Sequence, residues 1–268
     1  MRYRIVDVFT DQPLAGNALC VVVDPCPEPR MAAVAREVNL SETTFPTITG
    51  DGTYAMRIFT PGLEIPFAGH PTLGTAWVLG PGRWRQTTAG ATVTVEVTDD
   101  GAVMSQPDPV ITEVAPDGVD VALGLPGIEG AFLSVAGGTA HVLVPTTHPL
   151  DDLDPELATV KRVAARAGGI SLCAFRRLDD RTLHVRVFVP GAGVPEDPGT
   201  GSAAGPIALL ARRQWGTGVD VVIRQGDEMG RPCRIDAHAE PGALRVGGRV
   251  TACAEGAFVA FRDGASLS

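Results

Sequence analysis

Apolar and polar residues alternate in short runs along most of the chain, as they do in β-strands that bury one face. Clusters of glycine, proline, asparagine and aspartate separate these runs and mark turns. The runs predict strands at residues 3–9, 18–23, 41–48, 54–59, 92–98, 102–105, 131–135, 140–144, 171–176, 182–189, 219–224, 230–238, 243–247 and 257–262. This pattern favours a mixed, largely antiparallel sheet over a doubly wound parallel one.

Apolar residues recur at helical spacing in fewer places. We predict helices at residues 31–38, 72–79, 155–167 and 202–213. Asn39 follows the first of them and tolerates the left-handed conformation in which many helices end. The proline-bearing segments 24–30 and 106–126 are predicted to be loops, and the second is the candidate connection between two domains.

One stretch, residues 57–80, is repeated later in the chain. A constant offset of 129 residues maps Arg57 onto Arg186, Phe59 onto Phe188, Pro61 onto Pro190, Gly62 onto Gly191 and Pro66 onto Pro195. Each copy reads as a strand, a kinked turn and a helix start, which indicates a duplicated unit and favours two domains. Two helix starts that face each other would offer backbone N–H groups and positive dipole ends to a small anion.

Composition narrows the class of protein. The chain has 268 residues, of which 44% are hydrophobic and 20% charged, so we expect order almost throughout. Its net charge of −9, without a block of Lys and Arg, argues against nucleic acid as a partner. No apolar run approaches the roughly 20 residues that span a bilayer, and the first residues lack a signal peptide, so we expect a cytoplasmic protein with no membrane partner.

The five cysteines are scattered and show no CxxC spacing. This argues against a disulfide framework or a zinc site, and we expect the cysteines to be small core residues. The histidines show no metal-binding spacing either, so the predicted site needs no metal.

The second copy enters its helix through a glycine-rich segment, residues 196–202. Its spacing is neither GxGxxG nor GxxxxGK[ST], so a nucleotide phosphate is disfavoured. A carboxylate fits better, bound by the amides of Gly201 and Ser202 and by the Ser202 hydroxyl, while Asp197 handles a proton or an amino group. The alternative is a structural turn with Ser202 as the helix N-cap.

The corresponding turn of the first copy contains His70, next to Gly69. Alone, such a histidine is often only a hydrogen-bonded turn residue. If the two turns face each other, His70 and Asp197 lie across a cleft and could serve general acid–base chemistry.

Glu42 is a third candidate. An isolated glutamate is usually solvated on the surface. Here it stands in a strand with Phe45, and an inward carboxyl beside that ring would be desolvated and its pKa raised towards neutrality, as a proton shuttle requires.

Taken together, these segments resemble the PhzF-like family of phenazine-biosynthesis isomerases. The resemblance rests on NLSETTF at 39–45, TPGLEIPFAGHPTLGTA at 60–76 and EDPGTGSAAGP at 196–206, and extends to VDVFTDQPLAGN at 6–17 and QGDEMGRPCRI at 225–235. It implies an α+β fold like that of diaminopimelate epimerase, with two pseudo-symmetric lobes, each a β-barrel-like mixed sheet around a central helix. The site would lie in the cleft between them.

The resemblance also implies domain limits and an assembly. The N-terminal lobe would span residues 1–110 and the C-terminal lobe residues 111–255, and the last strand, 256–268, is a candidate to return to the first lobe. A homodimer without a cofactor is expected.

The family's site residues map onto matching positions. The resemblance makes Glu42 the proton carrier and His70 and Asp197 the neighbouring acid–base groups. It also makes Ser202 and Asn17 substrate-binding residues. We expect the two helix-start glycines, Gly69 and Gly201, to bind the substrate as well. Ala18 and Gly199 depart from the family pattern, which usually has Pro and Val there, and we expect these differences to alter the shape of the pocket.

The related epimerases and racemases use two cysteines as opposed bases, one at each helix start. This chain has no cysteine at either point, so two-thiol racemisation is disfavoured. We therefore expect an isomerase that moves a proton within a small unsaturated carboxylic acid. Two alternatives stay open: an epimerase that uses Glu42 and Asp197 as its two bases, and a non-catalytic protein that binds small carboxylates.

Overall fold

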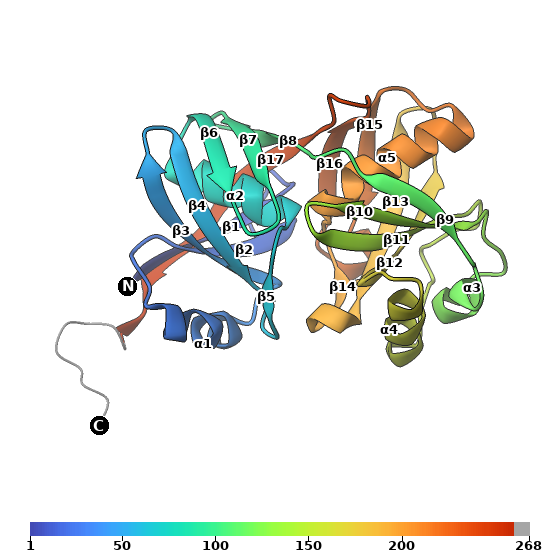
Figure 1. The fold of residues 1–268 in the computed structure, drawn as a ribbon, viewed down its shortest axis with the longest axis horizontal. Coiled ribbons are helices and arrows are strands. Elements are labelled where there is room, and N and C mark those ends of the chain that lie inside the picture. Colours follow the sequence, from blue (N-terminus) through green and yellow to red (C-terminus); the bar gives the residue numbers. More distant parts are fainter. Residues whose placement is uncertain (260–268) are drawn as a thin grey trace.

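The computed structural model describes residues 1–259 and has two lobes side by side, each with strands around a helix (Figure 1). The first half contains β1 (Arg2–Val8), β2 (Asn17–Val22), α1 (Glu28–Val38), β3 (Glu42–Gly50), β4 (Thr53–Phe59), β5 (Glu64–Ile65), α2 (Gly69–Leu79), β6 (Gly82–Thr87), β7 (Thr92–Val97) and β8 (Gly101–Ser105). The second half contains β9 (Val110–Val114), α3 (Val119–Leu123), β10 (Ala131–Ala136), β11 (Thr139–Pro145), α4 (Leu157–Arg166), β12 (Ser171–Arg177), β13 (Thr182–Val189), β14 (Val194–Asp197), α5 (Gly201–Trp215), β15 (Asp220–Gln225), β16 (Cys233–His238) and β17 (Arg245–Ala257).

The first lobe is a closed barrel. Within the described residues, β1, β2, β3, β4, β6, β7, β8 and β17 pair in that order, and β17 pairs back with β1. Helix α2 fills the barrel, and its first eight residues are all buried. A Cβ on Gly74 would lie 2.7 Å from a methyl of Leu19 and 2.9 Å from one of Val8. The missing side chain therefore lets α2 pack closely on β1 and β2.

The second lobe repeats the topology of the first. Strands β10, β11, β12, β13, β15, β16 and β17 pair in the same order as β1, β2, β3, β4, β6, β7 and β8. The directions also match, because β2–β3 and β4–β6 are parallel, as are β11–β12 and β13–β15. Helices α1 and α4 occupy equivalent connections, as do α2 and α5. The predicted α+β fold of two pseudo-symmetric lobes is confirmed.

Strand β17 belongs to both lobes. Its first residues pair with β16 and β8, and its last residues pair with β1, ending at Arg2 opposite Ala257. We predicted two short strands here, at residues 243–247 and 257–262. For the described residues this was wrong, because one strand runs without a break from Arg245 to Ala257. Residues 260–262 lie outside the described part of the chain, as does most of the segment 256–268. The domain limit at residue 110 stays a prediction.

Two helices begin earlier than we predicted, because we took a proline near each start as a sign that the helix had not yet begun. Helix α1 begins at Glu28, inside the predicted loop, and α2 begins at Gly69, before the predicted residue 72. Pro29 and Pro71 lie in the first turns, where a helix has no hydrogen bond for their missing N–H groups to break. Helix α1 ends at Asn39, which is left-handed (φ 53°) as predicted.

Several further elements were not predicted, among them β6, β9 and α3. Strand β6 follows α2 directly, although we read the glycines and proline there only as a helix stop. The predicted loop 106–126 contains β9, which pairs with β10, and the short helix α3.

Among the cysteines, Cys20, Cys173 and Cys233 are buried, whereas Cys26 and Cys253 are only partly buried. Within residues 1–259, no helix is long and apolar enough to cross a membrane.

Candidate active site

The two central helices begin against each other. A Cβ on Gly69, the first residue of α2, would lie 2.5 Å from the carbonyl carbon of Gly201 and 2.6 Å from the amide nitrogen of Ser202. Conversely, a Cβ on Gly201 would lie 3.2 Å from the carbonyl carbon of Gly69. Only glycine permits so close an approach at Gly69. The two positive helix ends thus converge at one point, as the sequence repeat predicted.

Asn17 joins groups from both lobes beside this junction. Its Nδ2 donates to Oδ1 of Asp197 at 2.7 Å and to the carbonyl of Gly199 at 3.0 Å, and lies 3.1 Å from Nδ1 of His70. Its Oδ1 accepts a hydrogen bond from Ser41 at 2.9 Å. Asn17 is 1% exposed, and its predicted contact with the substrate stays a prediction. We therefore expect it to position Asp197 and His70.

Asp197 is held at both carboxylate oxygens. Besides Asn17, the Thr200 hydroxyl donates to Oδ2 at 2.5 Å. The side chain of Gln225 donates to the Asp197 carbonyl at 2.7 Å, which also fixes the backbone. Burial raises the pKa of Asp197, and the hydrogen bonds from Thr200 and Asn17 oppose that rise.

Glu42 faces His70 across the same space. Its Oε2 lies 3.4 Å from Nε2 of His70, and neither atom has a hydrogen-bond partner among the described residues. Burial, and secondly the charge of Asp197, raise the pKa of Glu42 to about 8. Burial also lowers the pKa of His70 to about 3, so the imidazole is neutral near pH 7. Unpaired buried polar atoms are uncommon, and two of them face each other here.

We had predicted that Phe45 desolvates Glu42, and this was wrong. Residues three apart in a strand point to opposite faces. Phe45 packs below α1 with Cys20 and Phe59, whereas Glu42 lines a small cavity between the lobes. The side chain of Glu42 is only 14% exposed because both lobes cover it.

That cavity, about 60 Å³ in volume, contains most of the predicted site residues. Its polar lining includes Ser41, Glu42, Gly69, His70, His141, Asp197, Gly201 and Ser202. Apolar walls come from both lobes, among them Ile65 and Phe67 from the first and Val187 and Val189 from the second. A flat, partly apolar molecule with one anionic group suits such a lining.

Ser202 is not the N-cap that we considered as the structural alternative. Thr200 takes that place, and Ser202 lies in the first turn of α5. Its hydroxyl lies 2.9 Å from Nε2 of His141, whose Nδ1 lies 2.7 Å from the hydroxyl of Ser171. Sequence reasoning missed His141. The available signal was a single polar residue within the apolar run of β11, which gave no indication of its partner.

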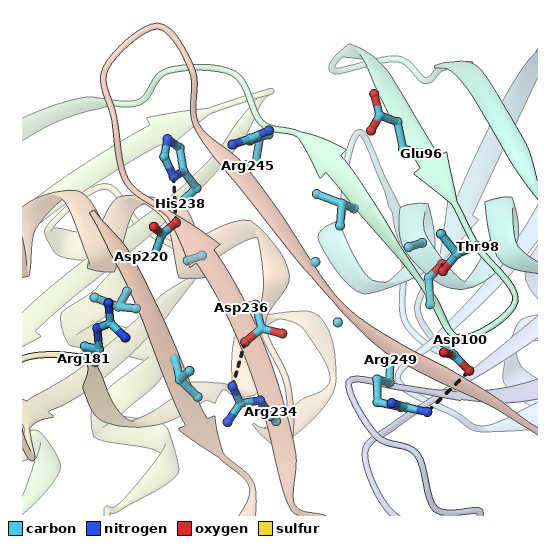
Figure 2. A pocket seen from close by; sticks show the side chains of 18 residues that line it. Glu96, Thr98, Asp100, Arg181, Asp220, Arg234, Asp236, His238, Arg245 and Arg249 are labelled. Carbon is cyan, nitrogen blue, oxygen red and sulfur yellow. Dashed lines mark hydrogen bonds and ion pairs between the residues drawn. The ribbon is translucent and has the colours of Figure 1, made fainter. Parts of the chain in front are cut away.

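A wider groove of about 750 Å³ lies along β17, between the β7–β8 hairpin and strands β15 and β16 (Figure 2). Its charged side chains largely pair with one another, as Asp220 with His238, Arg234 with Asp236 and Arg249 with Asp100. None of the predicted site residues lines this groove. Exposed pairs of this kind do not converge on a common ligand position, so we place the candidate chemistry in the smaller cavity.

One group of potential metal ligands lies apart from the cavity. Asp151, His184 and Glu228 bring their ligand atoms within 4.8 Å of one another. Arg186 interacts electrostatically with both acids, so its positive charge offsets theirs. None of these side chains lines the cavity, and we assign the group no part in the chemistry.

Comparisons with known proteins agree over almost the whole chain. A family model described as "Phenazine biosynthesis-like protein" (PhzC-PhzF) matches residues 6–256. The trans-2,3-dihydro-3-hydroxyanthranilate isomerase of Pseudomonas aeruginosa is 38% identical, covering 95% of this chain and 98% of that protein. The enzyme of the same name from Pseudomonas fluorescens is 39% identical, covering 89% of this chain and 90% of that one.

Solved structures show the same architecture. A structure described as a predicted epimerase from Pseudomonas aeruginosa is 29% identical with a TM-score of 0.82, covering 96% of this chain and 99% of that one. A probable proline racemase from Agrobacterium radiobacter is only 14% identical but has a TM-score of 0.67, covering 98% of this chain and 94% of that one. The second likeness concerns the fold alone.

Proposed function

Because the chain belongs to the phenazine biosynthesis-like (PhzC-PhzF) family and is an isomerase, we propose that it moves a proton within a small unsaturated amino carboxylic acid, with Glu42 as the proton carrier. The observation that carries this proposal is the position of the Glu42 carboxyl. It is desolvated, it lines the cavity where the two helices begin, and one of its oxygens has no hydrogen-bond partner among the described residues.

The substrate carboxylate would bind at the helix junction. The first amides of α2 and α5 have no partner within their own helices, and the Ser202 hydroxyl lies beside them. The positive ends of both helices favour an anion at that point. A carboxylate held there leaves the rest of a small molecule against the apolar walls, within reach of Glu42 and His70.

Glu42 suits the proton transfer better than Asp197. Burial raises the pKa of both carboxyls, but hydrogen bonds to both oxygens of Asp197 stabilise its charged form, whereas the pKa of Glu42 reaches about 8. Of two neighbouring buried carboxyls, the less hydrogen-bonded one holds the proton. The ionised Glu42 would take a proton from one carbon, the electron pair would shift along the conjugated system, and Glu42 would return the proton to a second carbon. This proton transfer changes no oxidation state overall, so it needs no oxidant or reductant.

For the substrate class, support comes from the relatives. Those at 38% and 39% identity are named as isomerases of trans-2,3-dihydro-3-hydroxyanthranilate, a small unsaturated amino acid with one carboxylate. We propose a substrate of that class. Ala18 and Gly199 do not line the cavity, and a Cβ on Gly199 would lie 2.7 Å from Sγ of Cys233 and 3.0 Å from the ring of Phe9.

Proton exchange with solvent tests the proposal directly. Wild-type protein incubated with trans-2,3-dihydro-3-hydroxyanthranilate in D₂O should convert it and incorporate deuterium at the carbon that receives the proton, as followed by NMR. Glu42→Gln should reduce this rate by several orders of magnitude, because the shuttle is the chemical step. Glu64→Gln, which removes an exposed acid on β5, is the control and should retain the wild-type rate. Wild-type conversion by Glu42→Gln would exclude Glu42 as the carrier.

The epimerase alternative has one observation in its favour, because the charge of Asp197 reaches Glu42 and two carboxyls therefore share the site. A product of opposite configuration with its double bonds unmoved would support that alternative over ours. The non-catalytic alternative is set aside, since the relatives are named as isomerases.

We also propose a homodimer. The family resemblance of the sequence motifs supports it. Light scattering coupled to size-exclusion chromatography should give twice the chain mass of 27.9 kDa, and a single-chain mass would contradict it.

A further inference from the structure

Four polar side chains form a line from the cavity into the core of the second lobe. The Ser202 hydroxyl lies 2.9 Å from Nε2 of His141, and Nδ1 of His141 lies 2.7 Å from the Ser171 hydroxyl. The line ends at Cys173, whose sulfur lies 3.4 Å from the Ser171 hydroxyl. Because His141 on β11 is the register partner of Ser171 on the parallel strand β12, the backbone fixes the central contact.

The line is dry except at its cavity end. Ser171 and Cys173 are 0% exposed, His141 is 4% exposed and Ser202 is 9% exposed. Burial lowers the pKa of His141 to about 4, so its ring is neutral under ordinary conditions. A neutral imidazole carries one N–H, so it donates at one nitrogen and accepts at the other.

Two directions of hydrogen bonding are therefore open to the line. In the first, Ser171 donates to Nδ1 of His141, Nε2–H donates to the Ser202 oxygen, and the Ser202 hydroxyl hydrogen is left for the cavity. In the second, Ser202 donates to Nε2, Nδ1–H donates to Ser171, and Ser202 offers only lone pairs to the cavity. A carboxylate can only accept hydrogen bonds, so it fits the first direction alone.

We propose that His141 is a positioning residue that turns the Ser202 hydroxyl towards a carboxylate in the cavity, with Ser171 and Cys173 holding the imidazole in the required tautomer. The inference rests on the proposed function in one respect, that a substrate carboxylate binds at the helix junction. It adds a specificity element to that site, because a ligand with a hydrogen-bond donor at the same position meets the wrong end of the Ser202 hydroxyl.

The tautomer can be observed directly. Protein labelled with ¹⁵N-histidine is titrated with 3-hydroxyanthranilate, an aromatic acid that retains the carboxylate of the relatives' substrate, and the His141 signals are assigned by comparison with His141→Gln. We expect Nε2 to be the protonated nitrogen in the complex. Protonation at Nδ1 in the complex would overturn the proposal.

Binding provides the second readout. Dissociation constants are measured by calorimetry for 3-hydroxyanthranilate and for its carboxamide, with wild type, His141→Phe, His141→Gln and Ser202→Ala. His141→Phe should weaken carboxylate binding by about tenfold or more and carboxamide binding far less, because a hydrogen bond to a charged group is the stronger one. His141→Gln should restore most of the affinity, since its amide can donate from nearly the same place as Nε2.

Coupling between the variants separates positioning from general damage. The double variant with Ser202→Ala should bind no more weakly than Ser202→Ala alone, because His141 acts through that hydroxyl. Equal loss for both ligands, or losses that add, would mean that His141 only supports the fold. If His141→Phe fails to fold, the tautomer measurement and His141→Gln still decide the matter. These binding measurements involve no turnover, so the Glu42 exchange assay can fail while they succeed, and the reverse.

Discussion

Gly69 and Gly201 touch backbone to backbone where the helices of the two lobes begin, so closely that a Cβ on Gly69 would lie 2.5 Å from the carbonyl carbon of Gly201. This contact sets the distance between the lobes at the cavity. It also brings the two anion-binding helix ends to one place.

Gly69→Ala should therefore separate the helix starts and reduce both stability and activity. The nearest atoms are backbone and cannot rotate away, so we expect a loss of roughly 1–3 kcal/mol in the free energy of unfolding and a marked fall in kcat/KM. Urea denaturation and the exchange assay measure the two effects. Gly218→Ala is a suitable control, because its added Cβ would have ordinary contacts of 3.6 Å or more. Equal behaviour of the two variants would contradict the role given to the junction.

The pH dependence of kcat/KM should follow the ionisation of Glu42. The carboxylate form takes the proton, and the pKa of Glu42 is raised to about 8. We expect kcat/KM to rise about tenfold per pH unit below that value and to level off above it, because this parameter reports the free enzyme. His70 adds nothing between pH 5 and 9, since its pKa is lowered to about 3. A profile that is flat from pH 6 to 9 would be incompatible with Glu42 as the base.

Stability should show the opposite trend in the same pH range. The pKa of Glu42 is about 8 in the folded protein and 4.5 as its ordinary value, so the folded state holds more protons between these values and loses stability as pH rises. Glu42→Gln removes this loss and should be more stable than wild type at pH 9 by up to a few kcal/mol, with little gain at pH 4. Urea denaturation at both pH values tests this.

Glu64→Gln gives the matched comparison for that pH effect. Hydrogen bonds from Arg57 lower the pKa of Glu64, so its charged form stabilises the protein above its ordinary pKa. Its variant should be no more stable than wild type at pH 9. A gain in Glu64→Gln like that of Glu42→Gln would show that the effect is not specific to the cavity.

The duplicated arginines should differ in their contribution to stability. Arg186 is 6% exposed, pairs with Glu196 at 2.8 Å and also donates to the carbonyls of Leu150 and Leu153. Its equivalent, Arg57, has a side chain that is 35% exposed. Arg186→Ala should cost roughly 3–5 kcal/mol, because Glu196 and two carbonyls lose their partner in a dry site.

Arg57→Ala is the internal control for that change. Each arginine also lies over the ring two residues on, at 5.2 Å for Arg57 and Phe59 and at 5.0 Å for Arg186 and Phe188. The stacking loss is therefore similar in both variants, and the loss in Arg57→Ala should stay near 1 kcal/mol. Comparable losses in urea denaturation would mean that burial does not distinguish the two copies.

Much of this architecture could be predicted from the sequence, because many strands and helix ends are determined by residues close to them in the chain. Alternation predicted most strands, and the shared positions of the two copies predicted the meeting of the helix starts. Asn39 ends α1 for a reason that lies within its own residue. The errors arose where a neighbour distant in sequence decides the outcome, as for β9, which is a strand because β10 pairs with it.

The site shows the same division. His70 and Asp197 could be placed together because each lies at a helix start of the repeat, and Asn17 now connects them. The burial of Glu42 was predicted with the wrong neighbour, since residues of both lobes around the cavity, and not Phe45, cover it. His141 escaped notice because its partners, Ser171 and Ser202, are 30 and 61 residues away along the chain.

Strand β17 has a consequence for how the protein is made. The first barrel closes only when β17 joins β1 to β8, yet β17 is the last strand in the described chain. While the ribosome is still making the C-terminal half, the N-terminal half therefore has two unpaired edges, on β1 and β8, of the kind that promote aggregation. The N-terminal lobe is synthesised first, but its barrel closes only when residues 245–257 have emerged.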